Sequence, residues 1–306
     1  MHLLENFLAY LSSFRNPKTI RQKRINLKAI EEFFEEYRET YNFNHETIAK
    51  LFSFLRVKKK YKLSTIKAIF IDLKLYLKYL DKKGFKTYFD NDALKFIFSS
   101  PTLKNEEEKE KEKSQEVFTK EELVEVLEYI KETNKAFYYF TCLLAFSGLR
   151  LNEALNLSIE DFERIDNLKW RIKVKEAKYG KERTAILTIP ERFKDFDNYL
   201  LRILAHYKAT GKDNLFKYKY AQGKKIYRIT EKIIDKFYRE ISKELGIKVN
   251  AHKFRKTLAT FLALENVNPA ILKELLGHSD VKTTLKYYTL AKRFLDKGEV
   301  EIKIKI

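Results

Sequence analysis

Five side chains between residues 150 and 287 could act together on a phosphate group: Arg150, His252, Arg255, His278 and Tyr287. Arg150 follows the tripeptide Ser-Gly-Leu, which predicts a turn before the start of a helix. His252 and Arg255 are three residues apart and therefore share one face of a predicted helix. Tyr287 lies nine residues after His278, which itself follows a glycine.

These residue types suit the cleavage of a phosphodiester bond without a metal ion. Arginine can neutralise the non-bridging oxygens, because its planar fork offers paired donors and keeps its charge. Tyrosine can attack phosphorus, but its ordinary pKa near ~10 means that it needs a base or a strong positive potential. A lysine or a histidine can give a proton to the leaving 5′ oxygen. The set therefore indicates phosphoryl transfer, with neither a metal nor a cofactor expected.

Taken singly, each segment has an ordinary explanation. Arg150 could be a surface arginine, and His252 or His278 could be a structural histidine with satisfied hydrogen bonds. Tyr287 is one of 19 tyrosines. The combination and the order of the segments carry the prediction.

In this order the segments resemble the tyrosine recombinases, a family that includes the Xer proteins, Cre and the phage integrases. Residues 147–157, SGLRLNEALNL, match the family's motif T-G-L-R-x-x-E-x-x-x-L. Residues 252–260, HKFRKTLAT, match H-x-L-R-H-T-x-A-T, and residues 275–287, LLGHSDVKTTLKY, match L-L-G-H-x-x-x-x-T-x-x-x-Y. The turn at 177–183, AKYGKER, is similar to the hairpin that carries the family's active-site lysine, and NPKTIR at 16–21 is similar to the start of its core-binding domain.

The resemblance implies roles for the principal residues. Arg150 and Arg255 would clamp the scissile phosphate, and Tyr287 would form a 3′-phosphotyrosine. The cationic side chains would neutralise the transition state in place of a metal. The phosphotyrosyl ester would conserve the bond energy, so that religation needs no ATP.

The resemblance also assigns the proton-transfer groups. Lys178 would be the general acid for the 5′ hydroxyl, and it is preferred over Lys181 because the hairpin aligns on its first lysine. His252 would be the acid/base partner of the tyrosine, and His278 a further donor to the phosphate. Glu153 is expected to hold the helix or the first arginine rather than to do chemistry.

Two departures from the family pattern matter for the chemistry. Lys256 stands where the family usually has a second histidine after the arginine, which puts an auxiliary proton or orienting role there in doubt. Tyr287 is followed by Tyr288, so the nucleophile has to be chosen. The spacing from His278 favours Tyr287, with Tyr288 as a packing residue.

The composition agrees with a nucleic-acid partner. The 306 residues carry a formal net charge of +19, which attracts polyanions, although a generally basic proteome would give the same sign. Cys142 is the single cysteine, which excludes an internal disulfide and a multi-thiolate metal site. The sequence shows neither a leader pattern nor a long apolar run, so we expect a cytoplasmic protein that does not enter a membrane.

The elements that must position these residues fall into two parts. Residues 101–117, PTLKNEEEKEKEKSQEV, are too charged to form a core and are interpreted as a partly helical linker. Residues 1–100 are predicted to form a helical core-binding domain that binds DNA. Residues 118–306 are predicted to form the catalytic domain, mostly helical with a small antiparallel sheet. The expected fold class is therefore mainly α, with two basic lobes suited to closing around DNA.

Hydrophobic periodicity and capping residues locate the expected elements. Helices are predicted near 3–11, 17–37, 45–55, 64–80, 91–98, 119–132, 135–146, 191–208, 230–245, 251–265 and 269–276, and strands at 168–174 and 183–189. In the tail, Val300, Ile302, Ile304 and Ile306 alternate with charged residues, which predicts a half-buried strand. We expect that strand to add to the sheet of a neighbouring subunit, with docking on its own domain as the alternative.

Three other functions compete with site-specific recombination by a homotetramer on two DNA sites. A type IB topoisomerase would share the chemistry but relax supercoils without a preferred site. A non-catalytic DNA-binding protein of the same fold would lack a catalytic residue, whereas all six positions are occupied. A basic RNA-binding helical protein would leave the three motifs unexplained. The sequence does not distinguish chromosome-dimer resolution from integration or excision of a mobile element.

Overall fold

The computed structural model describes residues 2–37, 41–114, 116–175, 182–210, 220–222, 225–227 and 229–296. These residues divide into two compact units, Met1–Ser114 and Gln115–Ile306. The fold is mainly helical with a small antiparallel sheet, which confirms the predicted fold class. Lys178, Lys181 and the tail at 297–306 lie outside the described residues, so what the sequence predicts of them stays a prediction.

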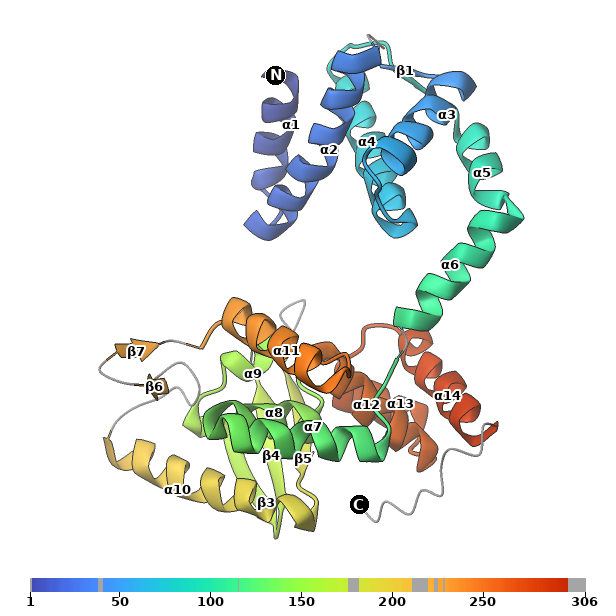
Figure 1. Cartoon of the computed structure of the whole chain (residues 1–306). Helices are drawn as coiled ribbons and strands as arrows, with labels where there is room; N and C mark the ends of the chain where they lie inside the picture. Colours follow the sequence, from blue (N-terminus) through green and yellow to red (C-terminus); the bar gives the residue numbers. More distant parts are fainter. Residues whose placement is uncertain are drawn as a thin grey trace. The chain divides into compact units, whose positions relative to one another are not determined.

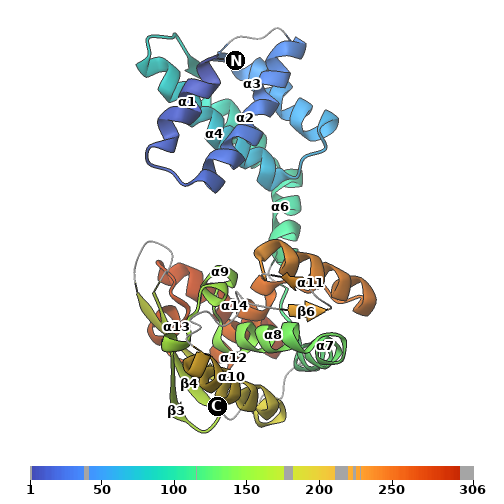
Figure 2. The same cartoon turned by 90° about the vertical axis from the view of Figure 1, so that its left-hand side faces the viewer.

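The first unit consists of helices around one hydrophobic core (Figures 1 and 2). Its elements are α1 (His2–Ser12), α2 (Pro17–Tyr37), β1 (Asn42–Phe43), α3 (His45–Ser53), the π-helical turn η1 (Phe54–Lys58), α4 (Leu63–Lys82), β2 (Tyr88–Phe89), α5 (Asn91–Ser99) and α6 (Pro101–Ser114). The Asn16 side chain accepts from the Thr19 backbone N–H at 2.8 Å and so caps α2, as the Asn-Pro pair predicts.

The charged segment predicted to link the domains is helical as far as Ser114 and belongs to the first unit. Arg56 of η1 donates two hydrogen bonds to Glu106, at 2.5 and 2.6 Å. Lys67 of α4 pairs with Glu107 at 2.5 Å. Glutamate and lysine favour a helix, and these ion pairs attach one side of it to η1 and α4.

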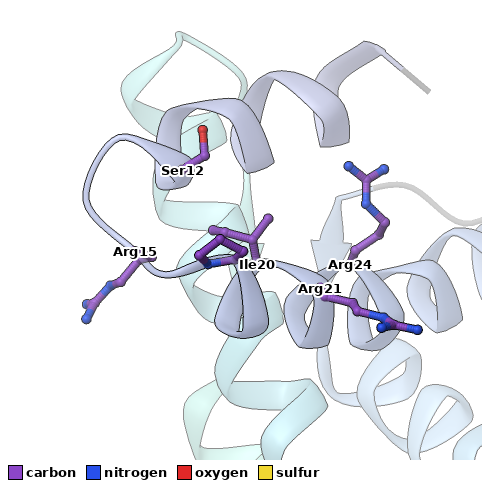
Figure 3. A pocket seen from close by; sticks show the side chains of 6 residues that line it. Ser12, Arg15, Ile20, Arg21 and Arg24 are labelled. Carbon is purple, nitrogen blue, oxygen red and sulfur yellow. The ribbon is translucent and has the colours of Figure 1, made fainter. Parts of the chain in front are cut away.

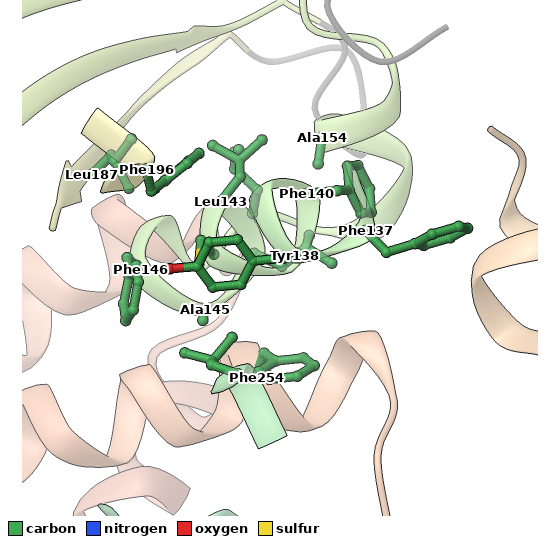
Figure 4. Close-up of a cluster of buried hydrophobic side chains, with 14 of the residues drawn as sticks. Phe137, Tyr138, Phe140, Leu143, Ala145, Phe146, Ala154, Leu187, Phe196 and Phe254 are labelled. Carbon is green, nitrogen blue, oxygen red and sulfur yellow. The ribbon is translucent and has the colours of Figure 1, made fainter. Parts of the chain in front are cut away.

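The second unit is built around α8 (Lys135–Ser147), which is buried on all sides and therefore lies at its centre. Figure 4 shows aromatic and aliphatic side chains of α8 together with Leu187, Phe196 and Phe254 from three other elements. The other elements are α7 (Lys120–Thr133), α9 (Leu151–Leu155), η2 (Ile159–Asp161), β3 (Phe162–Asp166), β4 (Lys169–Val174), β5 (Arg183–Thr188), η3 (Glu191–Phe193), α10 (Lys194–Thr210), β6 (Tyr220–Gln222), β7 (Lys225–Tyr227), α11 (Glu231–Leu245), α12 (Ala251–Leu264), α13 (Pro269–Leu276) and α14 (Val281–Asp296).

Several elements of this unit were not predicted from the sequence, among them β3 and α14. Strand β3 pairs antiparallel with β4 at the edge of the order β3-β4-β5, and most of its side chains are exposed, so it lacks the alternation of a half-buried strand. Helix α14 buries Thr284, Tyr287 and Ala291, a polar, an aromatic and a small residue that give only a weak apolar stripe. Among the described helices, none combines the length and the apolar character that crossing a membrane requires.

Candidate active site

Arg150 stands at the junction of α8 and α9. Helix α8 is terminated by Gly148 directly after it, whose φ of 64° lies in the left-handed region that glycine adopts without strain. The Arg150 backbone N–H donates to Glu153 at 2.8 Å, and its guanidinium donates to the other oxygen of the same carboxylate at 2.7 Å. Glu153 thus holds both the start of α9 and the arginine, in agreement with the structural role expected of it.

Helix α12 places His252 and Arg255 one turn apart. Asn250 caps this helix by accepting from the Lys253 backbone N–H at 2.9 Å. His252, in the first turn, keeps part of its surface open to solvent while the rest of it is covered by protein, whereas Arg255 is 2% exposed. The Arg255 guanidinium donates to the carbonyl of Gly148, at the end of α8.

The C-terminus of α13 binds three arginines through three successive carbonyl groups. The Leu275, Leu276 and Gly277 carbonyls accept, respectively, from Arg183, Arg255 and Arg150. The last carbonyls of a helix carry negative partial charge and lack partners within the helix, so cationic donors are favoured there. This helix end therefore gathers guanidinium groups that come from β5, α12 and the start of α9.

Positive charge exceeds negative charge at this point of the second unit. The carboxylate that the described residues place against Arg150 and Arg183 is that of Glu153. Burial alone would raise the pKa of Glu153, but the two arginines lower it, so the carboxylate stays ionised. Burial beside Arg150 and Arg183 lowers the pKa of Arg255 to about 9, which still leaves it charged at neutral pH. Three guanidinium groups against one carboxylate form a site for an anion.

Tyr287 comes to this cationic site on α14, which packs against α12 and α13. The residue is 8% exposed, and its ring stacks on that of His278 with 5.7 Å between centroids and 20° between planes. Burial raises the pKa of Tyr287, while the charges of Arg255 and Arg150 lower it in part. Tyr288 is half-buried and donates its hydroxyl to the Val267 carbonyl, which supports the choice of Tyr287 as nucleophile.

Both histidines are neutral near pH 7. Burial, followed by the charges of the neighbouring cations, lowers the pKa values of His252 and His278 to about 4. His278 shares a hydrogen bond of 2.9 Å between its Nδ1 and the Thr284 hydroxyl. A neutral imidazole can accept a proton from a tyrosine, and a bound phosphate would offset the positive charges and raise these pKa values.

Two further residues act on the site. Lys256, which replaces the family's usual histidine, contributes to the field, because its charge lowers the pKa of His252. The sequence places Arg183 at the end of the 177–183 turn but does not mark it as a site residue. Its position two residues after Lys181, within a recognisable motif, was the signal that could have marked it.

The first unit has a basic depression of its own. This cavity of about 340 Å³ is formed by the end of α1, the following turn and the start of α2. Figure 3 shows the side chains that line it. Its lining residues are Ser12, Arg15, Pro17, Ile20, Arg21 and Arg24. Arg24 pairs with Glu5, so part of its positive charge is already balanced.

Comparison with known sequences supports one family. The model of the phage integrase family matches residues 116–293. The chain is 31% identical to a probable integrase/recombinase of Aquifex aeolicus over 95% of this chain and 96% of that protein. It is 29% identical to the tyrosine recombinase XerA of Pyrococcus furiosus, over 58% of each chain.

Solved structures show the same fold. The recombinase XerH bound to a palindromic difH substrate aligns with a TM-score of 0.69 and 24% identity, over 92% of this chain and 79% of that one. The Tn1549 transposon integrase in complex with transposon right end DNA aligns with a TM-score of 0.64 and 14% identity, over 97% and 98% of the two chains.

Proposed function

Because this chain belongs to the phage integrase family and is a site-specific DNA recombinase of the tyrosine type, we propose that Arg150, His252, Arg255, His278 and Tyr287 carry its reaction. The observation that supports this assignment is their convergence. Residues from three separate motifs meet where the charges of Arg150 and Arg255 act on Tyr287, on His252 and on His278. Lys178 is proposed as the sixth member from the hairpin motif.

In the proposed reaction, the Tyr287 oxygen attacks the scissile phosphorus and the bond from phosphorus to the 5′ oxygen breaks. The phenolic proton passes to the neutral imidazole of His252, and the leaving oxygen takes a proton from Lys178. Arg150 and Arg255 stabilise the charge that develops on the non-bridging oxygens. A 5′ hydroxyl then attacks the phosphotyrosyl ester in the reverse sense, so joining needs no ATP.

The proposed assembly is a homotetramer on two DNA sites. Recombining two duplexes requires the exchange of four strands, and each chain contributes one Tyr287. Four covalent intermediates therefore require four chains. Mass photometry of the complex with site DNA should show four subunits and two duplexes, whereas a complex that recombines as a dimer would contradict the proposal.

The first unit is proposed to bind the DNA backbone. Arg15 and Arg21 line its basic depression, and guanidinium groups favour phosphate contacts. XerH, whose structure aligns with 92% of this chain, has been solved bound to its difH substrate. As an enzyme acting on DNA, the protein is proposed to work in the cytoplasm.

Covalent trapping on a random duplex library tests the function. Denaturation after a short incubation would retain DNA attached to protein, sequencing would identify that DNA, and mass spectrometry would locate the modified residue. We expect one enriched site and an adduct on Tyr287, formed equally in the presence of EDTA. Supercoil relaxation without an enriched site would favour a type IB topoisomerase, and binding without adducts would favour a non-catalytic protein.

A further inference from the structure

Arg183 connects three elements that meet at the proposed active site. It begins β5, and its side chain is 8% exposed. One terminal nitrogen donates to the Leu275 carbonyl at the end of α13. The other donates to Glu153 of α9 at 2.6 Å. Its planar fork therefore bridges a helix end and a carboxylate that lie far apart in the sequence.

The stem of Arg183 also fills the space beside Gly277. A Cβ atom added at Gly277 would lie 2.4 Å from Cδ of Arg183, closer than atoms can pack. Gly277 has a φ of +64°, so both its backbone conformation and its surroundings require glycine. Arg183 thus supports the turn that follows α13.

Both groups that hold the Arg150 guanidinium are in contact with Arg183. One terminal nitrogen of Arg150 donates to Glu153 at 2.7 Å, and the other donates to the Gly277 carbonyl at 2.7 Å. Arg183 binds the other oxygen of that carboxylate and packs against that glycine. The Arg150 side chain remains 29% exposed and open to an incoming phosphate.

Arg183 differs from Arg150 and Arg255 in the groups on which its charge acts. The charges that act on Tyr287 are those of Arg255 and Arg150, whereas the charge of Arg183 acts on His278. Contact with the phosphate is therefore assigned to Arg150 and Arg255, and Arg183 acts through another residue.

We propose that Arg183 is a positioning residue for strand cleavage, which fixes the two acceptors of Arg150 and thereby directs that guanidinium at the scissile phosphate. The inference rests on the proposed function, in which Arg150 neutralises this phosphate. Displacing a group in an active site by about 1 Å can lower a rate by about 10²-fold. Loss of Arg183 should therefore slow cleavage even where DNA still binds.

The test measures the cleavage rates of Arg183→Met, Arg183→Lys and the wild type. The substrate is the DNA site identified by covalent trapping, prepared in two forms. One form has an ordinary scissile phosphate. The other has a methyl group in place of one non-bridging oxygen, so that this phosphate is uncharged and Arg150 has no charge to neutralise. On ordinary DNA at saturating protein, we expect Arg183→Met to cleave about 10- to 100-fold more slowly. On DNA with the uncharged scissile phosphate, we expect the rates of Arg183→Met and the wild type to differ by less than about 3-fold.

Arg164 offers a matched control in the same sheet. It pairs with the buried Asp197 at 3.1 Å, and Arg164→Met removes a guanidinium from a buried carboxylate elsewhere in the second unit. We expect it to cleave both forms at wild-type rates. Arg183→Lys keeps the charge but cannot bridge both acceptors, and it replaces Arg183→Met in the comparison if the methionine variant does not fold.

The outcomes separate the inference from the function on which it rests. One outcome would overturn the positioning role and leave the proposed function intact. In it, Arg183→Met slows cleavage equally on both DNA forms, while the DNA with the uncharged scissile phosphate restores cleavage by Arg150→Met. Wild-type cleavage rates in Arg183→Met would also overturn it. If Arg150→Met itself is not rescued, the assignment of the phosphate clamp fails, and the role of Arg183 fails with it.

Discussion

A buried carboxylate of the first unit, Asp72, and one of the second unit, Glu153, both lie among cationic side chains, but the two clusters differ in their balance of charge. In the first unit Asp72 is 6% exposed, pairs with Lys23 and accepts from the Asn26 amide at 2.8 Å. In the second unit Glu153 is 5% exposed and binds two arginines.

The balance of charge distinguishes a structural network from a binding site. One ammonium and one neutral amide satisfy Asp72 and leave no net charge for a ligand, so this cluster serves to hold α2 against α4. The cluster around Glu153 includes Arg255 as a third cation and retains positive charge that only an incoming anion can balance. Variants of the two clusters should therefore affect different properties, stability in one and chemistry in the other.

The largest effect is expected from Tyr287→Phe. This variant keeps the ring that stacks on His278 but removes the attacking oxygen, so covalent adducts should fall by at least roughly 10³-fold while DNA binding persists. Denaturing gels of trapped complexes would measure the loss. Tyr76→Phe, at a buried tyrosine of the first unit, is the matched control and should retain adducts. Adducts that persist in Tyr287→Phe and vanish in Tyr288→Phe would move the nucleophile by one residue.

The next effect is expected from Arg255→Lys. Lysine keeps a positive charge but loses the fork that now reaches the Gly148 and Leu276 carbonyls, so the cleavage rate should drop by about 10²-fold or more. Single-turnover cleavage at saturating protein measures it. Arg164→Lys should cleave normally. A wild-type rate for Arg255→Lys would show that charge alone, without paired donors, suffices.

Asp72→Ala should affect stability rather than chemistry. The variant leaves the charge of Lys23 without its partner and the Asn26 Nδ2 group without its acceptor, both in largely buried positions, so the free energy of unfolding should fall by about 3 kcal/mol. Denaturant titration would measure this change. Folded Asp72→Ala protein should cleave saturating DNA at the wild-type rate, and a large loss of cleavage rate would contradict the separation of the two clusters.

The smallest expected effect is a change in how the free energy of unfolding depends on pH. Because the pKa values of His252 and His278 are lowered to about 4 in the folded protein, the unfolded chain binds protons more readily between pH 6.5 and 4. The free energy of unfolding should therefore decrease as the pH falls through this window and should not depend on these groups above it. His278→Asn should flatten the decrease by roughly 1 kcal/mol. An unchanged pH profile would show that His278 titrates normally in the folded state.

The sequence determined the local features of this protein. Motif spacing identified Arg150, Arg255 and Tyr287, and capping residues such as Asn16 marked where a helix begins. The first strand of the sheet and the helix that carries Tyr287 were missed, because an exposed edge strand and a weak apolar stripe give little periodicity.

The tertiary structure alone decided which distant groups meet. Three arginines bind successive carbonyls of α13, and Lys23 reaches Asp72 across 49 residues of sequence. Arg183 looks like the end of a polar turn until Glu153 and Leu275 are placed beside it. Hydrophobic periodicity and capping depend on neighbours within a few residues, whereas the acceptors of a buried arginine are set by how helices and strands pack. Short local motifs are therefore enough to identify the candidate site residues. The direction in which Arg150 points depends on how α9, α13 and β5 pack.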